Sequence, residues 1–164
     1  MTDGQRTANA AQITTPTDRE IRVERIFEAP RERVFAVMTD PELIPEWWGP
    51  RRYTTRVDQM DVRPGGDWRF VCRDEDGSEE GFRGSYRELT PPERIVQTFE
   101  WEPMAGYVSL ETMTLEDIGE GRTKVTTVSI FFTTEERDGM LNSGMEEGLN
   151  ETYERLDELL ARSS

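Results

Sequence analysis

Alternation of apolar and polar residues predicts that most of the chain forms β-strands. The first such segment, Ile21 to Phe27, places Ile21, Val23 and Arg25 on one side of a strand. The same pattern predicts six further strands, over residues 53–62, 67–73, 80–89, 93–101, 106–117 and 122–132. Short runs rich in Gly, Pro and Asp separate them, which is typical of tight turns. Strands joined in this way pair with their neighbours, so an antiparallel meander is expected.

Two short helices are predicted between the first strand and the second. Pro30 stands where the first turn of a helix tolerates proline, and apolar residues follow it at helical spacing. For the second helix, Asp40 is the expected N-cap and Pro41 the expected first residue. Gly49-Pro50 ends this helix.

The last segment has a helical period, and it predicts one amphipathic helix over roughly residues 134–161. Its apolar side is formed by Leu141, Met145, Leu149, Thr152, Leu156, Leu159 and Leu160. Three glycines inside this segment, Gly139, Gly144 and Gly148, each weaken a helix by about 1 kcal/mol relative to alanine. A bend, or a loop in the first part, is therefore expected.

These elements predict an α+β protein with the helix-grip fold. A curved seven-stranded antiparallel sheet wraps around the long C-terminal helix, which covers its apolar face, and the two short helices close one end. The length of 164 residues suits one domain. Residues 1–18 are small and polar without a period, and are expected to form a disordered leader before a ligand-binding domain at 19–161.

Composition argues against several classes of partner and cofactor. The net charge of −14, from 20 basic and 34 acidic residues, disfavours nucleic acid and anionic membrane surfaces as partners. No apolar run reaches the ~18 residues of a membrane span, and no signal peptide is recognised, so a cytoplasmic protein is expected. The chain has no histidine and only one cysteine, Cys72, so we expect neither a metal nor another cofactor.

Several motifs resemble a known family. They include Glu28-Ala29-Pro30, Trp47-Trp48-Gly49-Pro50, Asp61-Val62-Arg63-Pro64-Gly65-Gly66 and Gly144-Met145-Glu146-Glu147-Gly148. The chain is similar over residues 19–161 to proteins homologous to the C-terminal domain of the heat-shock-protein-90 ATPase activator. That family belongs to the superfamily of StAR-related lipid-transfer, polyketide-cyclase and pollen-allergen-like domains. The resemblance implies the helix-grip fold and a cavity between sheet and long helix. Many members carry tryptophan where this chain has Leu149, which implies a larger cavity here.

The candidate ligand site consists of aromatic, methionine and a few polar residues expected on the inner face of the sheet and on the helix opposite. Its members are Trp47, Trp48, Trp68, Phe70, Phe82, Tyr86, Gln97, Phe99, Trp101, Tyr107, Glu111, Met113, Met145 and Leu149. The alternative is that these side chains simply fill a core. A buried Glu111 would have a raised pKa.

Three functions fit this sequence. The first is non-catalytic binding of a small apolar or amphipathic molecule, which the lack of histidine favours. The second is a cyclase- or hydrolase-type enzyme acting on a polyketide-like substrate, with Glu111 or Tyr107 in the reaction. The third is a co-chaperone that stimulates a heat-shock-protein-90 ATPase. A homodimer formed through the sheet edge or the helix is also left open.

Overall fold

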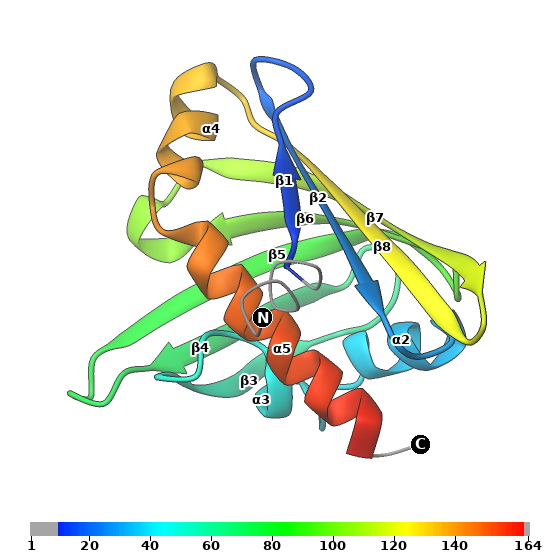
Figure 1. The fold of residues 1–164 in the computed structure, drawn as a ribbon. Coiled ribbons are helices and arrows are strands. Elements are labelled where there is room, and N and C mark those ends of the chain that lie inside the picture. The colour runs from blue at the N-terminus through cyan, green and yellow to red at the C-terminus, as the bar shows by residue number, and fades with distance from the viewer. Residues whose placement is uncertain (1–9, 163–164) are drawn as a thin grey trace, which may run out of the picture.

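An eight-stranded antiparallel sheet curves around the C-terminal helix in the computed structural model, which describes residues 10–162 (Figure 1). The strands are β1 (Gln12–Thr14), β2 (Glu20–Phe27), β3 (Thr54–Met60), β4 (Asp67–Arg73), β5 (Glu79–Thr90), β6 (Arg94–Trp101), β7 (Val108–Gly119) and β8 (Arg122–Ile130). Their order across the sheet is β1-β2-β8-β7-β6-β5-β4-β3. The predicted helix-grip fold is confirmed.

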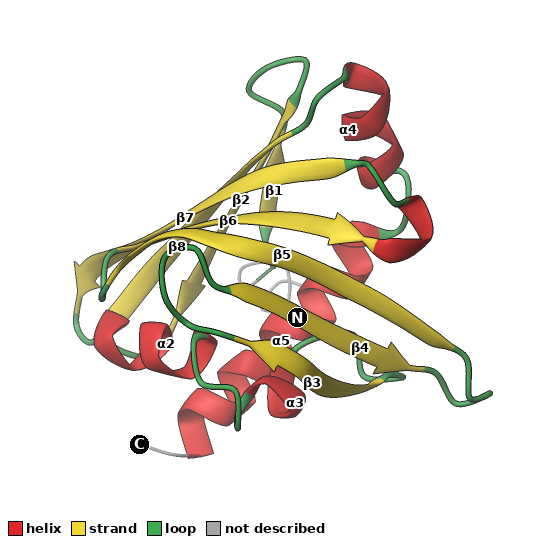
Figure 2. Ribbon diagram, turned by 180° about the vertical axis from the view of Figure 1, so that it is seen from behind, coloured by secondary structure: helices red, strands yellow, loops and turns green. Residues whose placement is uncertain are grey.

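The longest helix crosses the concave face of the sheet, and shorter helices lie toward both of its ends (Figure 2). The helices are α2 (Arg31–Met38), α3 (Ile44–Trp47), the 3-10 turn η1 (Glu102–Met104), α4 (Thr134–Leu141) and α5 (Met145–Arg162). Helix α5 contacts α2, α3 and α4, and α3 also contacts β3. Among the described helices, none is long and apolar enough to cross a membrane.

Alternation along β2 explains how the sheet meets the helix. Ile21, Val23, Arg25 and Phe27 are all buried, whereas Arg22 between them is exposed. Across from them, α5 buries Leu156 completely. Full burial of one such side chain contributes about 1.5–3 kcal/mol, so packing against the sheet, more than helix propensity, holds α5 in place.

The sheet bends at three irregular positions. The pairing register shifts between Val57 and Gln59 in β3, between Tyr86 and Glu88 in β5, and near the end of β7. Such bulges add twist and curvature to a strand. The curvature lets one face of the sheet surround a helix.

The number of strands differs from the prediction, because β1 lies inside the expected leader. Ile13 of β1 pairs with Val23 of β2, and the backbone N–H of Ala11 donates to Asn150 Oδ1 at 2.9 Å. A strand of three residues is too short for alternation to reveal. The sheet therefore has eight strands where seven were predicted, and residues 12–14 of the expected leader pair with β2. Residues 1–9 lie outside the described part.

The C-terminal segment forms two helices where one was predicted. Gly144 has a φ of +83°, a left-handed conformation that glycine adopts without strain, and it separates α4 from α5. Thr133 caps α4, its Oγ1 accepting from the backbone N–H of Glu136 at 3.1 Å. The expected bend thus takes the form of a short loop.

The second short helix begins later than predicted. Asp40 Oδ1 accepts from the backbone N–H of Glu42 at 2.9 Å, as a capping residue does. The turn it caps continues into α3, whose helical residues begin at Ile44.

Candidate functional site

Five aromatic side chains, which we call the aromatic cluster, meet on the concave face at the β3–β6 side of the sheet: Trp48, Trp68, Phe70, Phe82 and Phe99. The indole of Trp48, just after α3, packs edge-on against Phe70 at 5.1 Å and Phe82 at 5.0 Å between ring centroids. Phe99 lies 6.0 Å from Phe82 and 6.2 Å from Trp68. Edge-on and tilted contacts at such distances are favourable for aromatic rings.

Gly84 makes room for this cluster. A side chain at Gly84 would overlap the backbone oxygen of Thr98 and would stand 2.7 Å from Trp68 Nε1. The indole of Trp68 can therefore lie directly over β5, because no side chain separates it from the strand.

A row of polar side chains crosses three strands next to the cluster. Gln97 of β6 pairs in register with Glu111 of β7, which pairs with Ser129 of β8. Gln97 Nε2 donates to Glu111 Oε1 at 3.0 Å, and Ser129 Oγ donates to Glu111 Oε2 at 3.5 Å. Burial raises the pKa of the Glu111 carboxyl, and these two hydrogen bonds offset part of that effect.

The middle of the concave face keeps contact with solvent. Gln97, Phe99, Glu111 and Met113 are half-buried, although they occupy the central strands. Ile95, farther along β6, is buried. Glu111 therefore sits deep enough for burial to raise the pKa of its carboxyl and still retains some accessible surface.

Helix α5 supplies the opposite wall. Met145 and Leu149 are half-buried and pack against the core, and Tyr153 one turn later is buried. The ring of Tyr153 meets Phe27 edge-on at 5.2 Å. Burial raises the pKa of Tyr153 to about 12, so its phenol is neutral at physiological pH.

A buried ion pair fixes α5 on the sheet. Arg25 Nη1 lies 2.6 Å from Asp157 Oδ2, and the Arg25 side chain is 4% exposed. Its guanidinium also stands over the ring of Phe27, 4.8 Å from the centroid. This pair couples the position of the helix to β2.

The remaining predicted site residues differ in burial. Trp47 and Tyr86 are buried within the core, and burial raises the pKa of Tyr86 to about 12. Trp101 is half-buried near the end of β6, where its Nε1 donates to Glu80 Oε2 at 3.3 Å. Tyr107 is 52% exposed and precedes β7, so the structure does not bring it into the group.

Sequence reasoning missed Ser129 on the concave face of the sheet and Tyr153 on the opposing helix α5. Alternation along β8 puts Ser129 on the same side as the buried Val125, so the sequence could have predicted that Ser129 lies on the inner face. Its proximity to Glu111 follows only from the register between β7 and β8, which the sequence does not reveal.

The chemistry available here is limited. Cys72 is buried, and burial raises the pKa of its thiol, so it is a core residue as predicted. Within residues 10–162, no group of three or more Cys, Asp or Glu side chains is arranged to hold a metal ion. The face offers apolar surface and the Glu111 carboxyl with its hydrogen-bonding neighbours Gln97 and Ser129.

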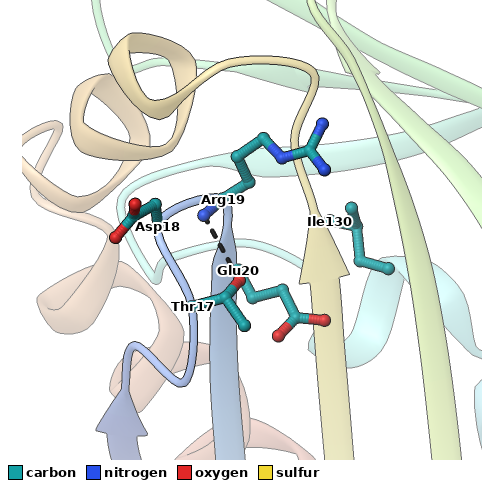
Figure 3. A pocket seen from close by; sticks show the side chains of 5 residues that line it. All are labelled: Thr17, Asp18, Arg19, Glu20 and Ile130. Carbon is teal, nitrogen blue, oxygen red and sulfur yellow. Dashed lines mark hydrogen bonds between the residues drawn. The ribbon is translucent and has the colours of Figure 1, made fainter.

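A separate surface pocket of about 410 Å³ lies at the turn between β1 and β2, where it meets the end of β8 (Figure 3). Thr17, Asp18, Arg19, Glu20 and Ile130 line it, and the backbone N–H of Arg19 donates to Thr17 Oγ1 at 3.3 Å. Its walls are mostly charged and exposed. It is distinct from the concave face and contains no predicted site residue.

The strand order and the C-terminal helix on the concave face define a helix-grip domain. The model of the family described as Activator of Hsp90 ATPase homolog 1-like protein matches residues 28–161. The chain belongs to this family, and the predicted resemblance is confirmed.

Solved structures support the same fold. A crystal structure of a protein from Rhodobacter sphaeroides is 28% identical, with a TM-score of 0.86 over 93% of this chain and 99% of that one. A solution structure of a protein from Arthrobacter aurescens is 24% identical, with a TM-score of 0.83 over 93% and 92%. A protein from Silicibacter pomeroyi with the family's name is 23% identical, with a TM-score of 0.72 over 88% and 99%. No curated protein matches the chain.

Proposed function

We propose that this domain binds a small apolar or amphipathic molecule between the concave face of the sheet and α5, without transforming it. The observation that carries the proposal is the half-burial of Gln97, Phe99, Glu111 and Met113 on the central strands. Side chains that only filled a core would be enclosed there, as Ile95 is. Apolar walls with a few polar groups are typical of small-molecule sites.

The residue types present favour binding over catalysis. The chain has no histidine, and the Ser129 hydroxyl, the nucleophile type that hydrogen-bonds the Glu111 carboxyl, lies 3.5 Å from Glu111 Oε2, which is longer than the roughly 2.6–3.2 Å typical of a nucleophile and its base. General acid–base chemistry usually pairs such a group with another positioned residue. Holding a ligand requires only the surface and the hydrogen bonds.

A neutral fluorescent probe tests the proposal. N-phenyl-1-naphthylamine is titrated into the protein, and we expect saturable enhancement of its emission with one site. Leu149→Trp places a larger side chain between α5 and the sheet, and should weaken binding at least about tenfold. Glu147→Trp, two residues away on the exposed side of α5, is the matched control and should bind as the parent does.

Two results would contradict the proposal. One is a complete lack of saturable binding. The other is equal affinity of the parent and Leu149→Trp, provided that circular dichroism shows the variant folded, because the probe would then bind elsewhere.

A further inference from the structure

The carboxyl of Glu111 lies in the proposed site without a cationic partner. Its two oxygens accept hydrogen bonds from the neutral side chains Gln97 and Ser129, at 3.0 and 3.5 Å. Within residues 10–162, no cation contributes to its pKa, which burial raises. A buried carboxylate is stable only when a cation or several strong donors compensate its lost hydration, and here that compensation is incomplete.

Arg25, whose charge acts on Tyr153 together with that of Glu111, is already committed to other partners. Arg25 Nη1 is paired with Asp157 Oδ2 at 2.6 Å and also donates to the backbone oxygen of Ile26 at 2.9 Å. Tyr153, which interacts electrostatically with both Arg25 and Glu111, is a neutral phenol. The protein therefore leaves the charge of an ionised Glu111 to be balanced by something else.

The aromatic cluster provides a second feature that favours a cation. Phe99 pairs with Ser109, two residues before Glu111 on β7, so Phe99 is a diagonal neighbour of Glu111 on one face. The faces of aromatic rings attract cations, most strongly where water is excluded. An ammonium group beside Glu111 would have aromatic surface within reach on the same side of the sheet.

The charge of the whole chain acts in the same direction. A net charge of −14 attracts cations to the surface and repels anions. A ligand carboxylate would be repelled by an ionised Glu111 carboxyl, whereas a ligand ammonium would stabilise the ionised form of that carboxyl.

We propose that the molecule bound by this domain is an amphipathic amine, whose protonated nitrogen pairs with the Glu111 carboxylate and whose apolar part lies against the aromatic cluster. This inference rests on the proposed function and adds the chemical class of the ligand. Gln97 and Ser129 orient the carboxylate for the pairing. A neutral ligand whose oxygen accepts a hydrogen bond from the un-ionised Glu111 carboxyl is the competing arrangement, and the experiment separates the two.

Decylamine, decanol and decanoate share one alkyl length and differ in head group. Their dissociation constants are measured at pH 7 by isothermal titration calorimetry, below the concentrations at which they aggregate. We expect decylamine to bind at least about tenfold more tightly than decanol, because a charge-assisted hydrogen bond is roughly twice as strong as a neutral one. A tenfold difference corresponds to about 1.4 kcal/mol. Decanoate should bind most weakly.

Glu111→Gln keeps the shape and removes the charge. It should reduce the affinity for decylamine at least about tenfold and leave that for decanol within about twofold. Glu116→Gln makes the same chemical change on the exposed part of β7 and should alter neither affinity.

The outcomes separate this inference from the proposed function. If decanol binds as tightly as decylamine, or if Glu111→Gln leaves their ratio unchanged, the amine assignment is overturned while ligand binding stands. If none of the three probes binds, both are overturned. The ratio of the affinities of the unmodified protein for decylamine and decanol decides the amine assignment by itself. The test therefore does not depend on whether the Glu111→Gln variant folds.

Discussion

The raised pKa of Glu111 predicts a specific dependence of stability on pH. In the unfolded chain this carboxyl titrates near its ordinary value of 4.5, and in the folded protein burial raises its pKa. Between these two values the folded state binds more protons than the unfolded state, so the free energy of unfolding falls as pH rises. Glu111 therefore lowers the free energy of unfolding least below pH 4.5. It lowers this free energy by its full amount above the pKa of the folded state.

Glu111→Gln removes this cost, because glutamine does not ionise. The variant should gain stability relative to the parent as pH rises from about 4 to 8. The gain should approach about 1.4 kcal/mol for each pH unit by which the folded-state pKa exceeds the unfolded one. Gln97 and Ser129 stay in place as hydrogen-bonding partners of an amide.

Urea unfolding followed by tryptophan fluorescence at four pH values between 4 and 8 measures this difference. Glu116→Gln, exposed on the same strand, is the control and should run parallel to the parent at every pH. If Glu111→Gln also ran parallel, the carboxyl would not be held in a desolvating environment, and the reasoning about the inner face would be refuted.

Three further changes test the packing, each by urea unfolding. Leu156→Ala empties a fully buried position between α5 and the sheet and should cost about 3–5 kcal/mol; a loss below 1 kcal/mol would contradict the position of α5. Gly84→Ala should cost about 1–3 kcal/mol or more, because the new methyl group meets backbone and the Trp68 indole; unchanged stability would contradict that contact. Asp157→Asn leaves Arg25 buried without its counter-ion and should cost about 3 kcal/mol, toward the lower end of the range for buried pairs because Asp157 is partly exposed; a neutral effect would show that the pair is not desolvated.

Much of this fold could be predicted because its strands alternate cleanly. The inward positions of β2, including the charged Arg25, follow from period two alone. The family motifs independently implied the same helix-grip arrangement. The brief strand β1 escaped prediction because three residues carry too little pattern, and it is held by pairing with β2 and not by its own composition.

The candidate site was predicted less completely, for a physical reason. Alternation states which face a residue occupies, but not which residue of the next strand stands beside it. Glu111 and Gln97 could be assigned to the inner face, while the contact of Glu111 with Ser129 depends on the register of β7 and β8. Tyr107 was placed in a strand predicted from residue 106, but β7 begins two residues later, at Val108, and leaves Tyr107 outside the strand.

Chemical-shift mapping tests the central claim, that the ligand binds between the concave face and α5, most directly. The ¹⁵N-labelled protein is titrated with N-phenyl-1-naphthylamine, and amide shifts are followed along the chain. The account predicts that saturable shifts concentrate at Gln97, Glu111 and Leu149. Saturable shifts confined to exposed apolar positions outside this group, such as Leu110 and Ile130, with Gln97, Glu111 and Leu149 unmoved, would contradict it.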